Sequence, residues 1–341
     1  MPPHALDLRQ ESRPRTDFEA ENDTKIILFM IIFSSLALAA VALRIVSKWM
    51  QWARLAWDDV LLLFALAQML TMNVLFVLTI KRGGLGRHVS TITDHQLAFF
   101  MKMYFIAGVV MPTCYATAKL SMLWLLYTTF SFRNFRKIVR FLGIVVMFYW
   151  IAAVVLDTFI CYPINARWNS KVKGTCSNKV IQVEYFATPI PWIITDFAIL
   201  IAPLPSLWVM KVSRARQIGL ITLFGFGIAT CAVACKRYVT LLGIDDEDIT
   251  YGLVEPVIWT MVESSTTIIC AALPASTPAL KRVMPTAHLT RFIEYVEDQF
   301  YAWKDKSTDW RNSARNMQAA QAPVEPPGTS APTSRLDLTP I

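Results

Sequence analysis

The sequence has few charged residues, few glycines and few cysteines, and each scarcity excludes a class of protein. Charged side chains make up 17% of the 341 residues, against about 25% in soluble domains. Twelve glycines and eighteen prolines exclude a collagen-like or glycine-rich disordered chain. Six cysteines are too few for a disulfide scaffold. Apolar residues reach 55% and the mean hydropathy is +0.42, so the composition indicates a membrane protein.

The basic residues of this chain, which give it a net charge of +8, stand between long apolar runs. Lysine and arginine in such positions anchor helices at a membrane surface and form no continuous phosphate-binding face. The pattern therefore favours membrane lipid, and not nucleic acid, as a partner. The sequence also has no glycine-rich phosphate loop, no HExxH zinc signature and no GxSxG motif, which disfavours a hydrolase or an ATPase.

Seven apolar stretches could each cross about 30 Å of hydrocarbon as a helix, which takes about 20 residues. They cover residues 26–43, 60–80, 97–130, 141–161, 180–210, 218–235 and 251–280. The sequence therefore predicts an all-α fold, a polytopic seven-transmembrane-helix bundle over residues 26–281, and no second domain.

Both ends of the chain differ from this bundle. Residues 1–25 are polar and lack the apolar core of a cleavable signal, so we expect a polar N-terminal tail. Within residues 282–320, apolar side chains recur at three- and four-residue spacing, which predicts an amphipathic helix at the cytoplasmic interface. Residues 321–341 are rich in proline and predict a disordered tail.

The orientation in the membrane cannot be taken from charge, because lysine and arginine are equally frequent on the two sides of the predicted bundle. Three other features favour an N-terminus outside the cell or in a lumen. Asn22 begins a glycosylation sequon, the segment 245–248 is acidic, and Cys161 and Cys176 flank one loop. A disulfide between these cysteines would need an oxidising compartment. We expect an integral protein of the endoplasmic reticulum or plasma membrane.

Three ionisable side chains fall near the middle of predicted helices, namely Lys119, Asp196 and Glu263. Each costs about 2.5–3.5 kcal/mol at the centre of a bilayer, so each needs a partner or water. We expect Lys119 to pair with Asp196 or with Glu263. Such a pair is either a packing bridge or a functional group. The functional alternative arises because burial moves the pKa values of carboxyl and amino groups toward neutral pH. In the functional alternative these three residues are catalytic or anchor a ligand.

A second polar group is expected nearer the outer mouth of the bundle. Its predicted ligand-binding residues are Glu184, Glu255, Asp157, Lys102 and Tyr251, with Arg237, Tyr104 and Tyr185 nearby. A polar and aromatic vestibule of this kind suits a small amphipathic ligand. The alternative is that these side chains snorkel and form an aromatic belt at the interface.

Two loop motifs have simpler interpretations. Asp58 and Asp59 precede the second helix, where N-capping and the helix dipole explain them. Gly84 and Gly86 predict a tight turn, and His88 is a polar loop residue there. No cysteine or histidine cluster accompanies it, so we expect no metal site.

Several of these patterns, taken in order, resemble the fungal rhodopsin-like integral membrane protein family. The matching residues are Trp57-Asp58-Asp59, Gly84-Leu85-Gly86 with His88, Lys119-Leu120-Ser121, Cys161 to Cys176 with Pro163, Trp168 and Gly174, Thr195-Asp196 with Pro203 and Pro205, and Trp259 and Glu263 with Pro274 and Pro278. The resemblance covers roughly residues 25–285. That family includes candidate G-protein-coupled receptors of filamentous fungi and membrane proteins of secondary-metabolite gene clusters, so it implies one of these two roles.

One position departs from the family pattern. After the lysine of the third helix the family usually has a tyrosine and then an arginine two residues on. Here Tyr127 stands one place late and no arginine follows it, which weakens a receptor role. Nor does the family name imply retinal, because residues 252–280 contain no lysine for a Schiff base. We expect no cofactor.

Two functions follow from the sequence. The first is a multi-pass membrane protein of a fungal secondary-metabolite pathway that acts on a lipophilic intermediate, with Asp196 and Glu263 as acid catalysts. The second is a receptor-like sensor of a small molecule that couples to a cytoplasmic protein partner. The departure after Lys119 slightly favours the first. A transporter is disfavoured because seven helices do not divide into two matching repeats.

Overall fold

The computed structural model describes residues 17–130, 132–169, 172–176, 189–203, 214–243 and 249–283. The chain divides into two units, residues 1–285 and 286–341, and only the first contains described residues. The predicted amphipathic helix beyond residue 283 and the proline-rich tail therefore lie outside the described part, as do Glu184 and the acidic segment 245–248.

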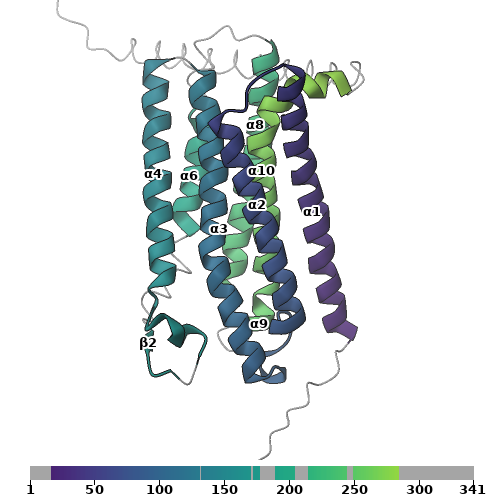
Figure 1. Ribbon diagram of the computed structural model, residues 1–341, viewed down its shortest axis with the longest axis vertical. Helices are drawn as coiled ribbons and strands as arrows, with labels where there is room; N and C mark the ends of the chain where they lie inside the picture. Colours follow the sequence, from purple (N-terminus) through teal and green to yellow (C-terminus); the bar gives the residue numbers. More distant parts are fainter. Residues whose placement is uncertain are drawn as a thin grey trace, which may run out of the picture. The chain divides into compact units, whose positions relative to one another are not determined.

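Long helices make up most of the described chain (Figure 1). They are α1 (Asp17–Met50), α2 (Trp57–Leu78), α3 (Asp94–Thr129), α4 (Arg133–Thr158), α6 (Pro189–Ile201), α8 (Arg214–Leu242) and α10 (Val254–Val283), with the one-turn α9 (Ile249–Gly252). Six of them are long and apolar enough to cross a membrane, and α6 is a shorter apolar helix. The predicted helical membrane bundle is confirmed. Its first helix begins nine residues before the apolar run, so the sequon at Asn22 lies within α1 and its glycosylation stays a prediction.

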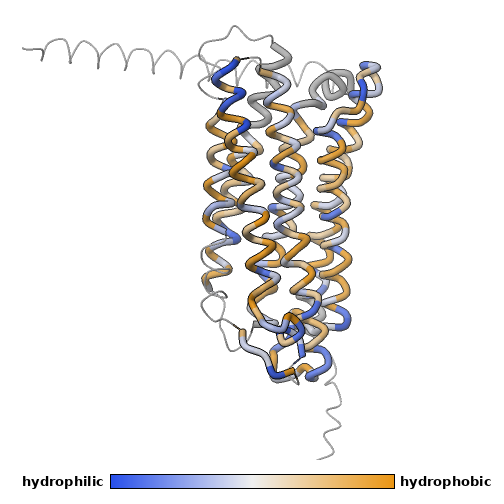
Figure 2. Tube along the Cα trace, turned by 60° about the vertical axis from the view of Figure 1, so that its left-hand side comes forward, coloured by the Kyte–Doolittle hydropathy of each residue, from blue (hydrophilic) through white to orange (hydrophobic). Residues whose placement is uncertain are grey.

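The outside of the bundle is apolar and its interior contains polar groups. Large hydrophobic side chains such as Leu28 and Ile31 on α1, and Ile144 and Phe148 on α4, are exposed. Figure 2 shows hydrophobic residues along the middle of the helices and hydrophilic residues gathered toward their ends. Lipid covers a helix surface of this kind, because contact of so large an apolar area with water is unfavourable.

Among the membrane-length helices of the described part, α10 is the most enclosed. It packs against α1 on one side and α8 on the other. Its buried face carries small polar residues, including Thr260, Ser264 and Thr267, whose size lets neighbouring helices approach closely. This central place of α10 puts Glu263 inside the bundle.

Two connections shape one end of the bundle. Gly84 and Gly86 have φ angles of 77° and 88°, which only glycine adopts without strain, so the predicted turn is confirmed. Gly86 N donates to the Thr250 carbonyl oxygen at 3.0 Å, which fixes this turn against α9. At the same end, β1 (Cys161–Tyr162) pairs antiparallel with β2 (Thr175–Cys176).

The predicted disulfide between Cys161 and Cys176 is present and closes this hairpin. The short helix η3 (Ile164–Arg167) lies within the closed loop. Figure 1 shows β2 and the start of α1 at the same end of the bundle. We call this end of the bundle the disulfide end. The other end, where α1 stops and α2 begins, is called the opposite end.

Candidate functional site

A cavity of about 110 Å³ lies between the helices toward the disulfide end. Most of its lining is apolar, with Met72 and Phe76 from α2, Met111 from α3, Leu253 just before α10 and Val257 in its first turn. Its polar lining residues are Tyr104, Asp157, Trp192, Arg237 and Thr260. Small-molecule sites typically combine an apolar wall with a few polar groups in this way.

Asp157 on α4 supplies an acid at the cavity wall. Only 2% of this residue is exposed, and its carboxylate lies over Gly108 of α3, where an added Cβ would come within 2.4 Å of Oδ2. Arg167 of η3 lies with Nη1 2.9 Å from Asp157 Oδ1 and donates to the Asp157 carbonyl oxygen at 2.6 Å. The closed disulfide loop thus provides the cation that balances this buried carboxylate.

Lys119 and Asp196 form an ion pair between α3 and α6. Lys119 Nζ lies 3.0 Å from Asp196 Oδ1 and donates to the Trp192 carbonyl oxygen at 2.8 Å and to Thr195 Oγ1 at 2.9 Å. An ammonium group has three donors, so these contacts use its full capacity. Of the two partners that the sequence left open for Lys119, the structure selects Asp196.

Glu263 of α10 pairs instead with Arg237 of α8. Arg237 Nε donates to Glu263 Oε2, and both side chains are almost fully buried. The Tyr115 hydroxyl donates to the same carboxylate oxygen at 3.1 Å, and the Arg237 guanidinium lies 5.9 Å from the centre of the Tyr115 ring. A buried carboxylate with a paired cation and a hydroxyl donor is well compensated.

Aromatic rings join the two ion pairs into one cluster. The Tyr115 and Trp192 ring centres lie 6.1 Å apart, and Lys119 Nζ lies 4.7 Å from the centre of the Trp192 ring. We call Tyr115, Lys119, Trp192, Asp196, Arg237 and Glu263 the central polar cluster. Trp192 and Arg237 belong both to this cluster and to the cavity wall, so the two are contiguous.

The sequence pattern predicts Arg237 for the outer vestibule, whereas in the structure it pairs with Glu263. Charge balance could have indicated it. Two acids, Asp196 and Glu263, and a single lysine in the middle of the predicted helices leave one buried carboxylate without a cation. Arg237 is the basic residue on the neighbouring helix that reaches that depth.

The predicted vestibule does not assemble as expected. Among its described members, Asp157, Tyr104 and Arg237 line the cavity, whereas Glu255, Lys102 and Tyr251 do not. The Glu255 side chain is 58% exposed and lies 3.2 Å from Lys236 Nζ, Lys102 is exposed, and Tyr251 stacks on His88 with ring centres 4.7 Å apart.

Lys102 and Glu255 do not line the cavity because of the directions in which their helices point them. Successive residues of an α-helix are rotated by about 100°, so Lys102 and Tyr104 point about 160° apart on α3 and cannot both face the cavity. Glu255 and Glu263 are separated by eight residues, so their directions differ by about 80°. Glu255 accordingly does not share the direction of Glu263, and it pairs with Lys236 at an exposed position.

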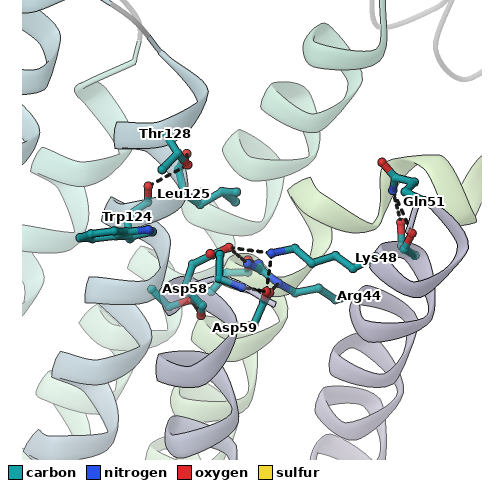
Figure 3. A network of polar contacts seen from close by, with 12 residues as sticks. Arg44, Lys48, Gln51, Asp58, Asp59, Trp124, Leu125 and Thr128 are labelled. Atoms are coloured by element: carbon teal, nitrogen blue, oxygen red, sulfur yellow. Dashed lines mark hydrogen bonds and ion pairs between the residues drawn. The ribbon is translucent and has the colours of Figure 1, made fainter. Parts of the chain in front are cut away.

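A second ionic group, shown in Figure 3, joins α1 to the start of α2 near the opposite end. Arg44 Nη2 bonds Asp58, its Nε lies 2.8 Å from Asp59 Oδ1, and Lys48 Nζ contacts both carboxylates. We call these four residues the α1–α2 ionic network. Arg44 is completely buried and also donates from Nη1 to the Ala271 carbonyl oxygen at 2.7 Å. The network therefore reaches α10.

This network revises the interpretation of Asp58 and Asp59 as N-terminal capping residues. Asp59 does accept from Ala56 N at 3.0 Å, as a capping residue would. Both carboxylates are nevertheless buried and paired with cations of another helix. Arg44 and Lys48 were not predictable as partners from the apolar run alone, because they follow it and resemble the charges that flank a membrane helix. Since α1 continues to Met50, Arg44 lies well inside it.

Within the described residues, no three histidine, cysteine, aspartate or glutamate side chains are grouped as metal ligands. The cavity itself presents Asp157, Trp192 and Arg237 as polar groups that a small molecule could contact.

Comparison with known proteins gives one family and several distant relatives. Residues 43–282 match the family model of the fungal rhodopsin domain. Polyenoic acids biosynthesis gene cluster protein Ba17b of Metarhizium anisopliae is 24% identical over 274 residues, which cover 75% of this chain and 73% of the relative. Receptor GIN3 of Arthrobotrys oligospora is 24% identical over 275 residues, 74% of this chain and 64% of the relative.

A SAT4 family membrane protein of Emericella nidulans is 26% identical over 212 residues, which cover 60% of this chain and 52% of the relative. The chain thus spans about half to three quarters of the length of these relatives. No solved structure is significantly similar to it. The matched relatives include both a gene cluster protein and a receptor, the same two classes that the sequence motifs imply.

Proposed function

The chain belongs to the fungal rhodopsin domain family, and from this premise we propose that it is a receptor-like membrane sensor. In this proposal a small lipophilic molecule binds in the cavity between α2, α3, α4, α6, α8 and α10. The bound molecule changes the packing of the helices, and the change reaches a cytoplasmic protein partner at the opposite end.

One observation carries this proposal: Trp192 and Arg237 line the cavity and also hold the two buried ion pairs. Trp192 accepts from Lys119, whose ion pair joins α3 to α6. Arg237 joins α8 to α10 through Glu263. A ligand that displaces the Arg237 side chain therefore acts on α8 and α10, and one that displaces the Trp192 ring, which lies 4.7 Å from Lys119 Nζ, acts on α3 and α6. Buried pairs of this kind have few alternative arrangements, so a small displacement favours a discrete change of packing.

A distance measurement across the bundle tests the proposal. Spin labels would be attached at Trp49→Cys on α1 and Ile201→Cys on α6, both exposed positions toward the opposite end. The exposed Cys235 would be replaced by serine, and the full chain placed in lipid nanodiscs. Four probes of similar size and different charge would be added: cyclohexanol, methylcyclohexane, cyclohexylammonium and cyclohexanecarboxylate.

We expect at least one probe to shift the distance between the labels in a saturable way by about 1–2 Å, as helices shift in switching proteins. The variant Ala153→Leu, which extends a cavity-lining side chain, is expected to abolish the shift. If no probe changes the distance in the wild-type chain, the cavity does not control helix packing and the sensor proposal is wrong.

A pathway role is the second candidate, favoured by the similarity to a polyenoic acids biosynthesis gene cluster protein of Metarhizium anisopliae. In this proposal Asp196 and Glu263, with Lys119, act as acid–base groups on a lipophilic intermediate. Comparative metabolite profiles of a deletion strain would test it, after complementation with the wild type, Asp196→Asn or Glu263→Gln. Accumulation of one defined intermediate that the amide variants fail to clear would support catalysis. An unchanged profile would count against it.

A further inference from the structure

Asp157 is the feature of the cavity wall that the sensor proposal leaves unused. Its carboxylate is buried, and neither oxygen has a hydrogen-bond partner among the described residues. The ion pair with Arg167 Nη1 at 2.9 Å balances the charge but provides no well-directed hydrogen bond. A buried carboxylate oxygen without a donor is costly, so this acceptor calls for a donor from a bound molecule.

The charges at the wall constrain the ligand further. Among the described lining residues, Asp157 and Arg237 are the charged ones, and each is neutralised by its own partner, Arg167 or Glu263. A cationic ligand would compete with Arg167 for a carboxylate that is already paired. An anionic ligand would lie beside the Asp157 and Glu263 carboxylates, which would repel it. An uncharged ligand fits this balance.

The size and the remaining lining define the rest of the ligand. Beyond its polar groups the wall consists of methionine, phenylalanine, proline, alanine and aliphatic side chains. The volume is about 110 Å³, somewhat below an engineered cavity of about 150 Å³ that binds benzene. One small ring or a short alkyl chain is therefore the apolar part that this space can hold.

Resting on the proposed binding function, we propose that the cavity binds an uncharged lipophilic alcohol or phenol whose hydroxyl group donates a hydrogen bond to the Asp157 carboxylate. Gly108 is the positioning residue for this contact. With no side chain at 108, the carboxylate can lie directly against the α3 backbone at the cavity wall. The hydroxyl group satisfies the acceptor and adds no charge to a wall that is already balanced.

The test uses three probes that have seven non-hydrogen atoms each. Cyclohexanol has a neutral donor, methylcyclohexane has none, and cyclohexylammonium is a cation. Binding of radiolabelled cyclohexanol to the full chain in nanodiscs would be measured, with empty nanodiscs subtracted, and the other two probes would be used as competitors. We expect cyclohexanol to bind at least about tenfold more tightly than either competitor, because a hydrogen bond to a charged group contributes about 1.5–3 kcal/mol.

Two charge-matched variants assign the preference to Asp157. Asp157→Asn keeps the size of the side chain and replaces the charged acceptor with an amide oxygen, so we expect cyclohexanol affinity to fall about tenfold. Asp94→Asn removes the same charge at an exposed position on α3 and is expected to leave the affinity unchanged. Ala153→Leu reduces the cavity without altering Asp157 and is expected to abolish binding of cyclohexanol.

Three results would overturn the inference. If methylcyclohexane binds as tightly as cyclohexanol, Asp157 recognises no donor. If cyclohexylammonium binds more tightly than cyclohexanol, the charge of the Asp157 carboxylate is not balanced by Arg167. If Asp157→Asn leaves the affinity for cyclohexanol unaltered, the hydroxyl group does not contact Asp157. If cyclohexanol fails while another probe shifts the spin-label distance, the ligand class is wrong and the sensor proposal survives. If no probe binds or shifts the labels, both fail.

Discussion

At the scale of single residues, the ion-paired acids inside the described part of this bundle face cations that come from other elements of the chain. Asp58 and Asp59 face Arg44 and Lys48, and Asp157 faces Arg167 of the disulfide loop. Such pairs contribute little net stability compared with apolar residues of the same size, because both charges lose their hydration. Removal of one partner, by contrast, leaves a buried charge and is strongly destabilising.

Arg44→Met is therefore expected to destabilise the folded bundle by about 3–5 kcal/mol. Two buried carboxylates would then share the single cation of Lys48, and the Ala271 carbonyl oxygen would lose its donor from α1. Thermal unfolding in detergent, followed by tryptophan fluorescence, measures the effect as a lower Tm. Arg54→Met, at an exposed position, is the matched control and should melt like the wild type.

A second substitution separates lost charge balance from lost packing. In Arg44→Met with Asp58→Asn, one carboxylate and one cation remain, Asp59 and Lys48. We expect the double variant to recover much of the Tm lost by Arg44→Met alone. If the single variant melts like the wild type, Arg44 is not held in the buried network described above.

At the scale of helices, close approach of α3 and α4 depends on a position without a side chain. Gly108 of α3 lies against Asp157 of α4, and an added Cβ would be 2.4 Å from Oδ2 and 2.6 Å from Cγ. Small residues at helix contacts are a general feature of membrane bundles, since they allow backbones to approach. Here the same contact also positions an acid at the cavity wall.

Gly108→Ala is expected to move the Asp157 carboxylate, weaken the α3–α4 contact and lower the Tm. Gly143→Ala on α4 is the control, because no atom lies within 4 Å of its added Cβ; in a helix interior this change is neutral or stabilising by about 0.5–1 kcal/mol. Thermal melts of the two variants should therefore shift in opposite directions or differ clearly in size. Equal shifts would contradict the close contact.

The disulfide hairpin between α4 and α6 constrains the loop that carries Arg167. Closure of a loop of about 15 residues contributes about 3 kcal/mol, and the two cysteines are separated by 15 positions. Replacing both Cys161 and Cys176 by serine is expected to speed tryptic cleavage after Arg167 about a hundredfold through local opening. Mass spectrometry of the fragments measures this rate. Cys235→Ser, which removes an exposed free cysteine, should leave it unchanged.

The elements were predictable from the sequence to a greater extent than the contacts between them. Apolar runs locate helices because the hydrocarbon thickness sets their length. They say little about rotation, because a helix that is apolar over most of its surface does not indicate which side faces inward. The predicted site accordingly included Asp157, which lines the cavity, together with Lys102 and Glu255, which are exposed.

At the scale of the whole bundle, polar groups occupy three levels between the disulfide end and the opposite end. Asp157 and Arg167 lie nearest the disulfide, the central polar cluster adjoins the cavity on its side away from the disulfide, and the α1–α2 ionic network lies nearest the opposite end. α10 contributes to the last two through Glu263 and the Ala271 carbonyl oxygen. This helix is therefore one element through which a ligand near Asp157 could act on the opposite end; α3 is another, because Ser121 donates to the Asp58 carbonyl oxygen at 2.6 Å.

The direction of that path in the cell depends on orientation, for which the disulfide is the strongest argument. A disulfide persists in an oxidising compartment, so we predict that the disulfide end, with the N-terminus, faces the cell exterior or a lumen. Ser90→Cys in η2 (Val89–Thr91) and Arg54→Cys after α1 provide exposed labelling sites at the two ends. Both variants would be made in the Cys235→Ser background.

A membrane-impermeant maleimide is expected to label Ser90→Cys, and not Arg54→Cys, on intact protoplasts if the protein resides in the plasma membrane. In sealed microsomes of the endoplasmic reticulum the cytoplasmic face is accessible, so the same orientation predicts labelling of Arg54→Cys alone. The reverse pattern in either preparation would place the disulfide in the cytoplasm. A ligand would then reach the cavity from the cytoplasmic side, and the partner of the sensor would have to lie outside.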